Sequence, residues 1–219
     1  LHYHNIVYVE KFFDFLPGDK EVLFDISKKY NIKLIIPLEE ESVKLELSKT
    51  SAIIKEKEHT IKRYASGENL FGWVIKENPS DEELEPYLRL KKEIERIDEK
   101  HPVIYLTREA NAFPLYATVS SVSGLTHWKT RNPWELGQLI KTHIKFVSGQ
   151  QLWAIGPTFV FGSGTPDWNS APEIRLMINL AISNGARGWM SYTYHNTPLW
   201  AGGEYQRSLT GPFLTFSDV

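Results

Sequence analysis

The sequence predicts an α/β fold in which parallel strands alternate with helices and close into a barrel. Short apolar runs rich in β-branched and aromatic residues alternate with amphipathic stretches, the order expected of parallel strands joined by crossover helices. The strands are almost continuously apolar, as in a sheet that is buried on both faces. Polar and aromatic residues follow nearly every strand, and in a barrel these positions meet at one mouth.

An open, doubly wound sheet is the other architecture that right-handed crossovers allow. Such sheets often bind nucleotides through a glycine-rich phosphate loop after the first strand. The first predicted strand, residues 5–9, is not followed by such a loop. The barrel is therefore the favoured fold.

Three strands are expected early in the chain, at residues 5–9, 32–38 and 70–75. A helix is predicted within residues 17–31, with Asp19 as its N-cap. Its apolar positions fall on one face: Val22, Leu23, Ile26 and Tyr30. A long charged helix is expected from about residue 42 to residue 64.

The clearest predicted helix follows the strand at residues 70–75. Ser80 can cap it, and Glu83, three residues later, completes a capping box. Acidic residues fill the first turn, where they complement the helix dipole. Its apolar face consists of Leu84, Tyr87, Leu88, Ile94 and Ile97.

The second half continues the alternation. Four further strands are expected, at residues 102–107, 116–124, 151–161 and 186–194. The gap between the first two is too short for a helix, whereas helices are expected at residues 132–149 and 171–185. Gly149 and Gly185 end these helices, as glycine commonly does.

The predicted strands number seven, whereas a complete (β/α)8 TIM-type barrel has eight strands in typically about 250 residues. We therefore expect residues 1–200 to form such a barrel lacking its first strand. Residues 201–219 are expected to be a C-terminal extension, and further domains of the same polypeptide are expected partners.

Composition narrows the classes of function. The formal net charge is −2, which provides no field for nucleic acid or an acidic membrane. Cysteine is absent, so disulfides and thiolate chemistry are excluded. No apolar run approaches the roughly 20 residues of a membrane span. The seven histidines show no HExxH spacing, so neither a metal nor another cofactor is expected.

Aromatic residues make up 13% of the chain and include seven tryptophans. Core packing accounts for about half of the tryptophans in our interpretation. The others are candidates for stacking against the apolar faces of sugar rings.

Two segments resemble glycoside-hydrolase-type (β/α)8 barrels. The segment LFGWVIKENPSDEELEPYLRLKKEIERIDEKHPVIYL, residues 70–106, resembles the fourth strand, helix and fifth strand of those proteins. The segment PEIRLMINLAISNGARGWMSYTYH, residues 172–195, resembles their last helix and strand. The resemblance implies a carbohydrate substrate and an extracellular or periplasmic location, and residues 1–13 are not expected to be a signal peptide.

The family pattern places its general acid/base on the Glu of Asn-Glu-Pro at the end of the fourth strand. Here Asn78 precedes Pro79, and the carboxylate lies one residue earlier, at Glu77. Adjacent strand residues point to opposite faces, so this shift matters unless the strand end is irregular. The family's nucleophile ends the seventh strand, where this chain has no carboxylate before Asp167.

Glycosidic hydrolysis uses two carboxyl groups, about 5–5.5 Å apart in retaining enzymes and roughly 6.5–9.5 Å apart in inverting ones. Glu77 follows an apolar run that could keep it protonated, and Glu109, after the next strand, is its expected partner. Each has a plainer interpretation, as an ion-pairing residue beside Arg108. Glu39, Glu40, Glu41 and Asp167 are weaker candidates, and Glu173 fits a helix start.

Polar and aromatic side chains at the strand ends are candidates for binding sugar. They are Asn78, His127, Trp128, Trp168, Tyr192, Tyr194 and His195. The sequence therefore predicts a glycoside hydrolase, with a non-catalytic glycan-binding or structural barrel as the alternative.

Overall fold

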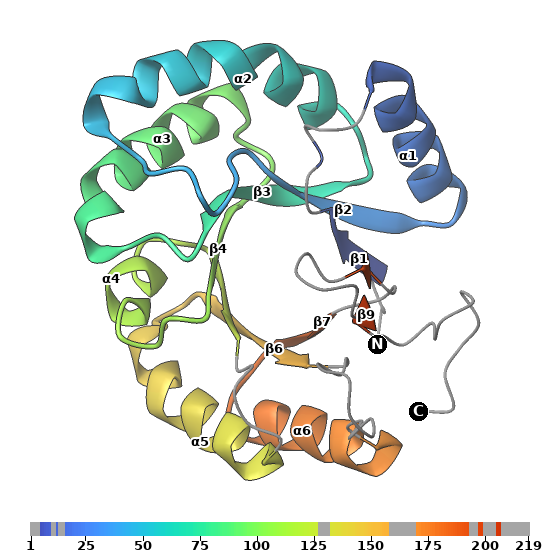
Figure 1. The fold of residues 1–219 in the computed structure, drawn as a ribbon, viewed down its shortest axis with the longest axis vertical. Helices are drawn as coiled ribbons and strands as arrows, with labels where there is room; N and C mark the ends of the chain where they lie inside the picture. Colours follow the sequence, from blue (N-terminus) through green and yellow to red (C-terminus); the bar gives the residue numbers. More distant parts are fainter. Residues whose placement is uncertain are drawn as a thin grey trace. The chain divides into compact units, whose positions relative to one another are not determined.

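Strands and helices alternate in a computed structural model that describes residues 5–9, 12, 16–126, 132–157, 170–192, 197–198 and 205–206 (Figure 1). The chain divides into two compact units, Leu1–Ser123 and Gly124–Val219. Each unit contains parallel strands with a helix between neighbours. The predicted α/β class with parallel strands is confirmed, whereas the TIM-type barrel lacking its first strand and the predicted domain division stay predictions.

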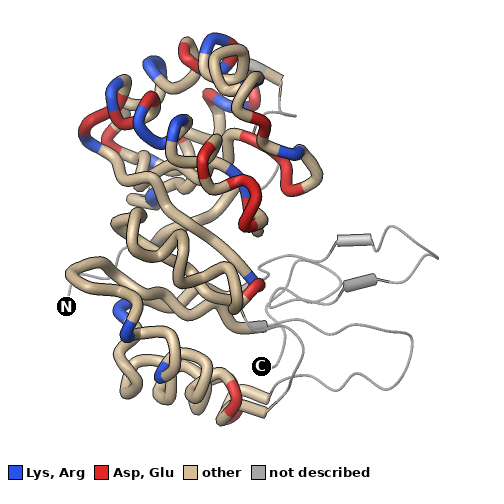
Figure 2. The backbone as a smooth tube through the Cα atoms, turned by 90° about the vertical axis from the view of Figure 1, so that its left-hand side faces the viewer, with Lys and Arg blue, Asp and Glu red and all other residues tan. Residues whose placement is uncertain are grey.

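The first unit contains four parallel strands: β1 (Asn5–Tyr8), β2 (Ile32–Pro37), β3 (Leu70–Glu77) and β4 (Val103–Thr107). Each strand pairs with the next along the chain. Helices α1 (Pro17–Lys29), α2 (Thr50–Ala65) and α3 (Leu84–Ile97) connect them and lie on one side of the strands in Figure 1. The charged residues of both signs are interspersed over the helices of this unit (Figure 2), which suits solvated helix faces.

An aromatic cluster packs between α3, β4 and the short helix α4 (Phe113–Ala117). Tyr105 and Tyr116 stack with ring centroids 4.8 Å apart, and Tyr87 meets Tyr116 edge-on at 4.9 Å. All three rings are fully buried. Aromatic pairs in these arrangements add to the stabilisation from apolar burial.

The second unit contains β6 (Gln151–Pro157) and β7 (Gly188–Tyr192), which pair in parallel. Helix α6 (Ala171–Ser183) connects them, and α5 (Pro133–His143) packs against α6. A Cβ on Gly137 would lie 3.2 Å from the Leu180 Cβ, so glycine permits this close helix contact. Strand β5 (Val122–Thr126) spans the boundary between the units, and β8 (Thr197–Pro198) pairs antiparallel with β9 (Tyr205–Gln206).

Several predicted element bounds are wrong. Helix α2 begins at Thr50, after the 3-10 turn η2 (Leu47–Lys49), and not near residue 42. The gap judged too short for a helix contains α4, and its residues Tyr116 and Ala117 were predicted to be in a strand. Phe113, Tyr116 and Ala117 are buried, so tertiary packing selects a helical turn over local strand propensity.

Helix α1 also departs from the prediction. Its N-cap is Leu16, and Pro17 occupies the first turn, where its missing N–H has no intrahelical partner to lose. Asp19 lies inside that turn, where it complements the dipole instead of capping the helix.

No helix in the parts of the chain that the structure describes is long and apolar enough to cross a membrane.

Candidate active site at the carboxyl ends of β3 and β4

Strand β3 ends in a register shift. Trp73 and Val74 pair with Val103 and Ile104, but the next paired residue is Glu77, opposite Leu106. Between these two pairs β3 advances by three residues and β4 by two. Strand β3 therefore contains one extra residue, as in a β-bulge. The strand end that carries Glu77 is therefore irregular.

Lys76, beside Glu77, is buried in an ion pair. Its Nζ donates to the Glu83 carboxylate at 3.0 Å and to the Val43 carbonyl at 2.7 Å. The same carboxylate accepts hydrogen bonds from the Leu45 N–H at 2.6 Å and the Ser80 N–H at 2.7 Å. Buried charges need this degree of compensation.

The Glu83 pKa reflects opposing effects. Burial raises it, but the hydrogen bonds from the Leu45 and Ser80 backbone and from Lys76 outweigh burial and hold the pKa below its ordinary value. Glu83 also forms the predicted capping box with Ser80. Glu77 itself is half-buried.

Asn78 connects the end of β3 to the segment that follows β4. Its backbone is left-handed, with φ of 47°, a conformation that Asn adopts more readily than most residues. Its N–H donates to the Leu106 carbonyl at 3.0 Å, and its Oδ1 accepts from the Arg108 N–H at 2.6 Å. Its side-chain oxygen therefore holds the neighbouring strand end, and its expected role in binding substrate stays a prediction.

Arg108 brings together carboxylates that follow two different strands. Its Nη2 lies 2.6 Å from Glu41 Oε1, and its Nε lies 3.7 Å from Glu109 Oε1. Glu41 follows β2, whereas Arg108 and Glu109 follow β4, so the pairs connect the segments after two strands that lie on either side of β3. The Glu109 side chain is 62% exposed, and such pairs contribute little to stability.

Glu39 differs from Glu41 because it is almost buried. Burial raises its pKa, and Lys57, whose Nζ lies 3.8 Å from Glu39 Oε1, partly offsets that increase. Lys57 belongs to α2, so Glu39 contacts a helix. Glu173 forms a capping box with Ser170 at the start of α6, which is the structural role expected from the sequence.

The remaining predicted binding residues are not placed. His127, Trp128, Trp168, Tyr194 and His195 lie outside the described residues, as does Asp167. Tyr192 ends β7, and only its backbone is described. Their roles stay predictions.

Two contacts of this region were not anticipated from the sequence. They are the buried Lys76–Glu83 pair and the Glu41–Arg108 pair. A lysine inside an otherwise apolar strand was the available signal for the first. The second joins residues far apart in the chain and has no local signature.

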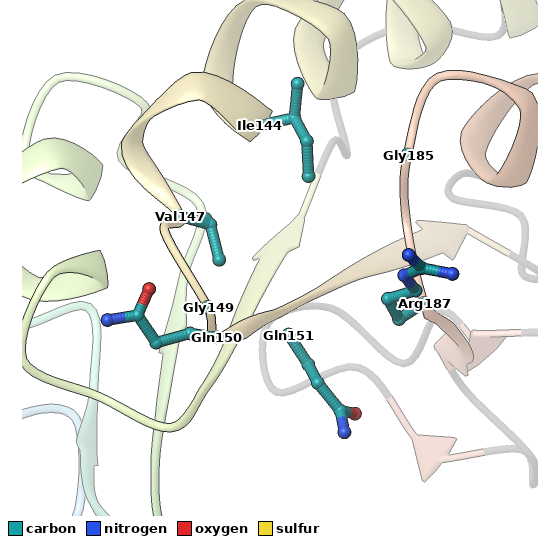
Figure 3. Close-up of a pocket in the computed structure, with 7 residues that line it drawn as sticks. All are labelled: Ile144, Val147, Gly149, Gln150, Gln151, Gly185 and Arg187. Carbon is teal, nitrogen blue, oxygen red and sulfur yellow. The ribbon is translucent and has the colours of Figure 1, made fainter.

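A cavity of 710 Å³ lies in the second unit (Figure 3). It is lined by Ile144, Val147, Gly149, Gln150, Gln151, Gly185 and Arg187. Gln151 opens β6 and Arg187 precedes β7, so the cavity lies at the amino ends of these strands. Sites in parallel α/β folds lie at the carboxyl ends, and the side chains of Gln150 and Arg187 point apart in Figure 3. We therefore do not assign the substrate to this cavity.

Among the residues that the structure describes, no group of three or more His, Asp or Glu is arranged to hold a metal ion.

No protein-family model matches the sequence, and no curated protein matches it. Solved structures do match the fold. A β-galactosidase from Bacillus circulans sp. alkalophilus aligns over 92% of this chain with a TM-score of 0.76 and 8% identity. A GH2 β-galacturonidase from Eisenbergiella tayi aligns over 89% with a TM-score of 0.66 and 12% identity. A GH10 xylanase from Thermobacillus composti aligns over 85% with a TM-score of 0.62 and 10% identity.

At these identities the likeness shows the fold alone. The alignments span 48% of the β-galactosidase chain, 38% of the β-galacturonidase chain and 76% of the xylanase chain.

Proposed function

We propose that the chain belongs to a carbohydrate-active barrel that hydrolyses a glycosidic bond, with Glu77 as the general acid/base. The three solved structures with this fold named above are glycosidases by name, which supports a carbohydrate as the substrate class. The observation that carries the proposal is the β-bulge before Glu77. It supplies the irregular strand end needed to accommodate a carboxylate one residue earlier than in the Asn-Glu-Pro pattern.

In the proposed reaction the Glu77 carboxylic acid donates its proton to the glycosidic oxygen as the bond to the sugar breaks. Glu109, after the neighbouring strand, is the proposed second carboxylate. It would attack the anomeric carbon in a retaining enzyme or activate a water in an inverting one. The aromatic and polar residues His127, Trp128, Trp168, Tyr192, Tyr194 and His195 are proposed to bind the sugar, in an enzyme outside the cytoplasm.

A non-catalytic glycan-binding barrel is the second candidate. One observation favours it: Glu109 is mostly exposed and lies beside Arg108, whereas catalytic carboxylates are commonly held in shielded sites. In that case the strand ends would bind a glycan without turning it over.

Steady-state hydrolysis of α- and β-linked aryl glycosides and oligosaccharides tests the two candidates. We expect Glu77→Gln to lower kcat about 10²–10⁴-fold on oligosaccharides, because general acid catalysis contributes that much. The loss should be smaller on aryl glycosides with a good leaving group, which need less protonation. Glu85→Gln, at an exposed residue of α3, is the matched control and should retain activity.

Unchanged turnover in Glu77→Gln would remove Glu77 from the mechanism. Calorimetric binding of an oligosaccharide without turnover of any substrate would favour the glycan-binding barrel.

A further inference from the structure

The helix α5 carries an exposed tryptophan in its first turn. The Trp134 side chain is 59% exposed, whereas Trp73 and Trp153 are buried. A single exposed apolar residue is ordinary in a folded protein, so exposure alone assigns Trp134 no function. Its backbone, its direction and its place in the second unit decide what it can do.

The backbone that carries Trp134 is fixed by a helix cap. The Asn132 Oδ1 accepts a hydrogen bond from the Trp134 N–H at 3.1 Å, and the Asn132 carbonyl accepts one from the Glu135 N–H at 3.0 Å. Pro133, between them, is buried and occupies the first turn, where its fixed φ suits a helix start. The position of the residue is therefore set before any ligand arrives, which lowers the ordering cost of binding.

The Trp134 side chain projects from the outer side of α5. Leu136 and Ile140 are buried on the inner side. Because each helical residue turns by roughly 100°, Trp134 lies about 120–160° around the helix from these two residues. Its neighbour four residues on is Gln138, which is exposed. An amide that can donate and accept hydrogen bonds therefore lies on the same outer side as the indole.

The first turn of α5 lies toward the carboxyl ends of the strands in the second unit. Ile144 and Val147, which follow α5, line the cavity at the amino ends of β6 and β7 (Figure 3). Trp134 belongs to the other end of the helix, roughly 15 Å earlier along its axis. Ligands of parallel α/β folds bind at the carboxyl ends of the strands. Trp134 is therefore at the end of this unit where a ligand is expected.

The surroundings of Trp134 favour a sugar over a protein partner. A specific protein interface buries about 800 Å² on each side and has an apolar centre. The other exposed residues of α5 are all polar: Glu135, Gln138, Lys141 and Thr142. One flat aromatic face among hydrogen-bonding side chains matches a sugar ring, which has an apolar C–H face and a rim of hydroxyl groups.

We propose that Trp134 is a sugar-stacking residue that binds one unit of an oligosaccharide or polysaccharide. The inference rests on the carbohydrate substrate class of the proposed function and adds a residue separate from those proposed to hydrolyse or bind the substrate. One exposed ring binds a single sugar weakly, so its effect is largest on a chain whose other units bind elsewhere on the protein.

Affinity electrophoresis of the 219-residue chain, in gels that contain soluble xylan, galactan or polygalacturonate, tests the proposal. We expect Trp134→Ala to weaken the affinity for the bound polysaccharide about two- to tenfold, because an aromatic stacking contact contributes that much. Trp134→Phe keeps a ring and should retain part of the affinity. Tyr30→Ala is the matched control, since Tyr30 is 60% exposed at the end of α1, and it should bind as the wild type does.

A second measurement needs no substitution. The bound polysaccharide should reduce acrylamide quenching of the wild-type tryptophan fluorescence, because it covers the exposed indole. The far-UV circular dichroism and Tm of each variant check that it is folded.

Three outcomes would overturn the inference: no binding of the wild type to any of the three polysaccharides, equal affinity of Trp134→Ala and the wild type, or a wild-type dimer in sedimentation velocity that Trp134→Ala dissociates. In the last case a second copy of the chain would cover the ring.

The same proteins separate this inference from the proposed hydrolysis. Binding that depends on Trp134 without turnover of any glycoside would support the stacking role and contradict the hydrolase. Turnover that Glu77→Gln abolishes, together with binding that is independent of Trp134, would support the hydrolase and overturn the stacking role.

Discussion

Asn78 has two structural roles that substitutions can separate. Its backbone is left-handed, and its side-chain oxygen accepts from the Arg108 N–H. Asn78→Gly keeps the backbone preference but removes the acceptor, so we expect a loss of about 0.5–1.5 kcal/mol in the free energy of unfolding. Asn78→Ala removes both and should lose about 1–2 kcal/mol more.

Denaturant unfolding measures these differences, and Asn78→Asp is the control that keeps an acceptor oxygen at the same position. If Asn78→Ala had the same free energy of unfolding as Asn78→Gly, the left-handed backbone at this position would not affect stability.

Residue-level roles were only partly predictable. The sequence indicated a carboxylate, an amide and a proline at the end of β3, and these positions do lie at that strand end. It did not show that the amide holds the Arg108 backbone, because that partner is 30 residues away. Side-chain partners across strands depend on register, and the register here includes a bulge.

At the scale of elements, the buried Lys76–Glu83 pair joins β3 to the start of α3. We expect Lys76→Met to lower the free energy of unfolding by about 3–5 kcal/mol, because a buried carboxylate loses its counter-charge. The double variant Lys76→Met/Glu83→Gln should recover part of that loss, because the glutamine carries no charge and its oxygen can still accept a backbone hydrogen bond.

A double-mutant cycle by chemical denaturation gives the coupling energy between the two side chains. Additive effects of the single substitutions would contradict the described pairing.

Elements with strong local signals were predictable. Strand β3 and the Ser80–Glu83 capping box both form as expected. The start of α2 was not predictable. Residues 41–46 include three charged residues and are helix-compatible in sequence, yet they lie in a non-helical segment whose Leu45 N–H donates to Glu83. The sequence pattern grouped Val22, Ile26 and Tyr30 on one face of α1, but it did not predict that these side chains are exposed, because burial depends on what lies beside the helix.

At the scale of the whole molecule, buried tyrosines should make the protein sensitive to alkali. Burial raises the pKa of Tyr87 and of Tyr105 well above its ordinary value near 10. Above pH 10 the unfolded chain releases these protons while the folded protein keeps them. Stability is therefore fully present below about pH 10 and falls as the pH rises, by up to about 1.4 kcal/mol per pH unit for each tyrosine.

Thermal unfolding between pH 8 and 12 measures this slope. Tyr105→Phe should have a shallower decline than the wild type, since one titrating group is removed. Parallel curves for the two proteins would contradict the predicted contribution of Tyr105.

The Glu83 carboxylate also has a consequence for motion. It binds the Leu45 N–H, the Ser80 N–H and Lys76, which also holds the Val43 carbonyl. Neither amide can open to solvent without disturbing a shared buried charge. In hydrogen exchange we therefore expect the amides of Leu45 and Ser80, 35 residues apart in the chain, to show one common opening free energy. The loop after β2 and the start of α3 would then open together, as a single cooperative unit.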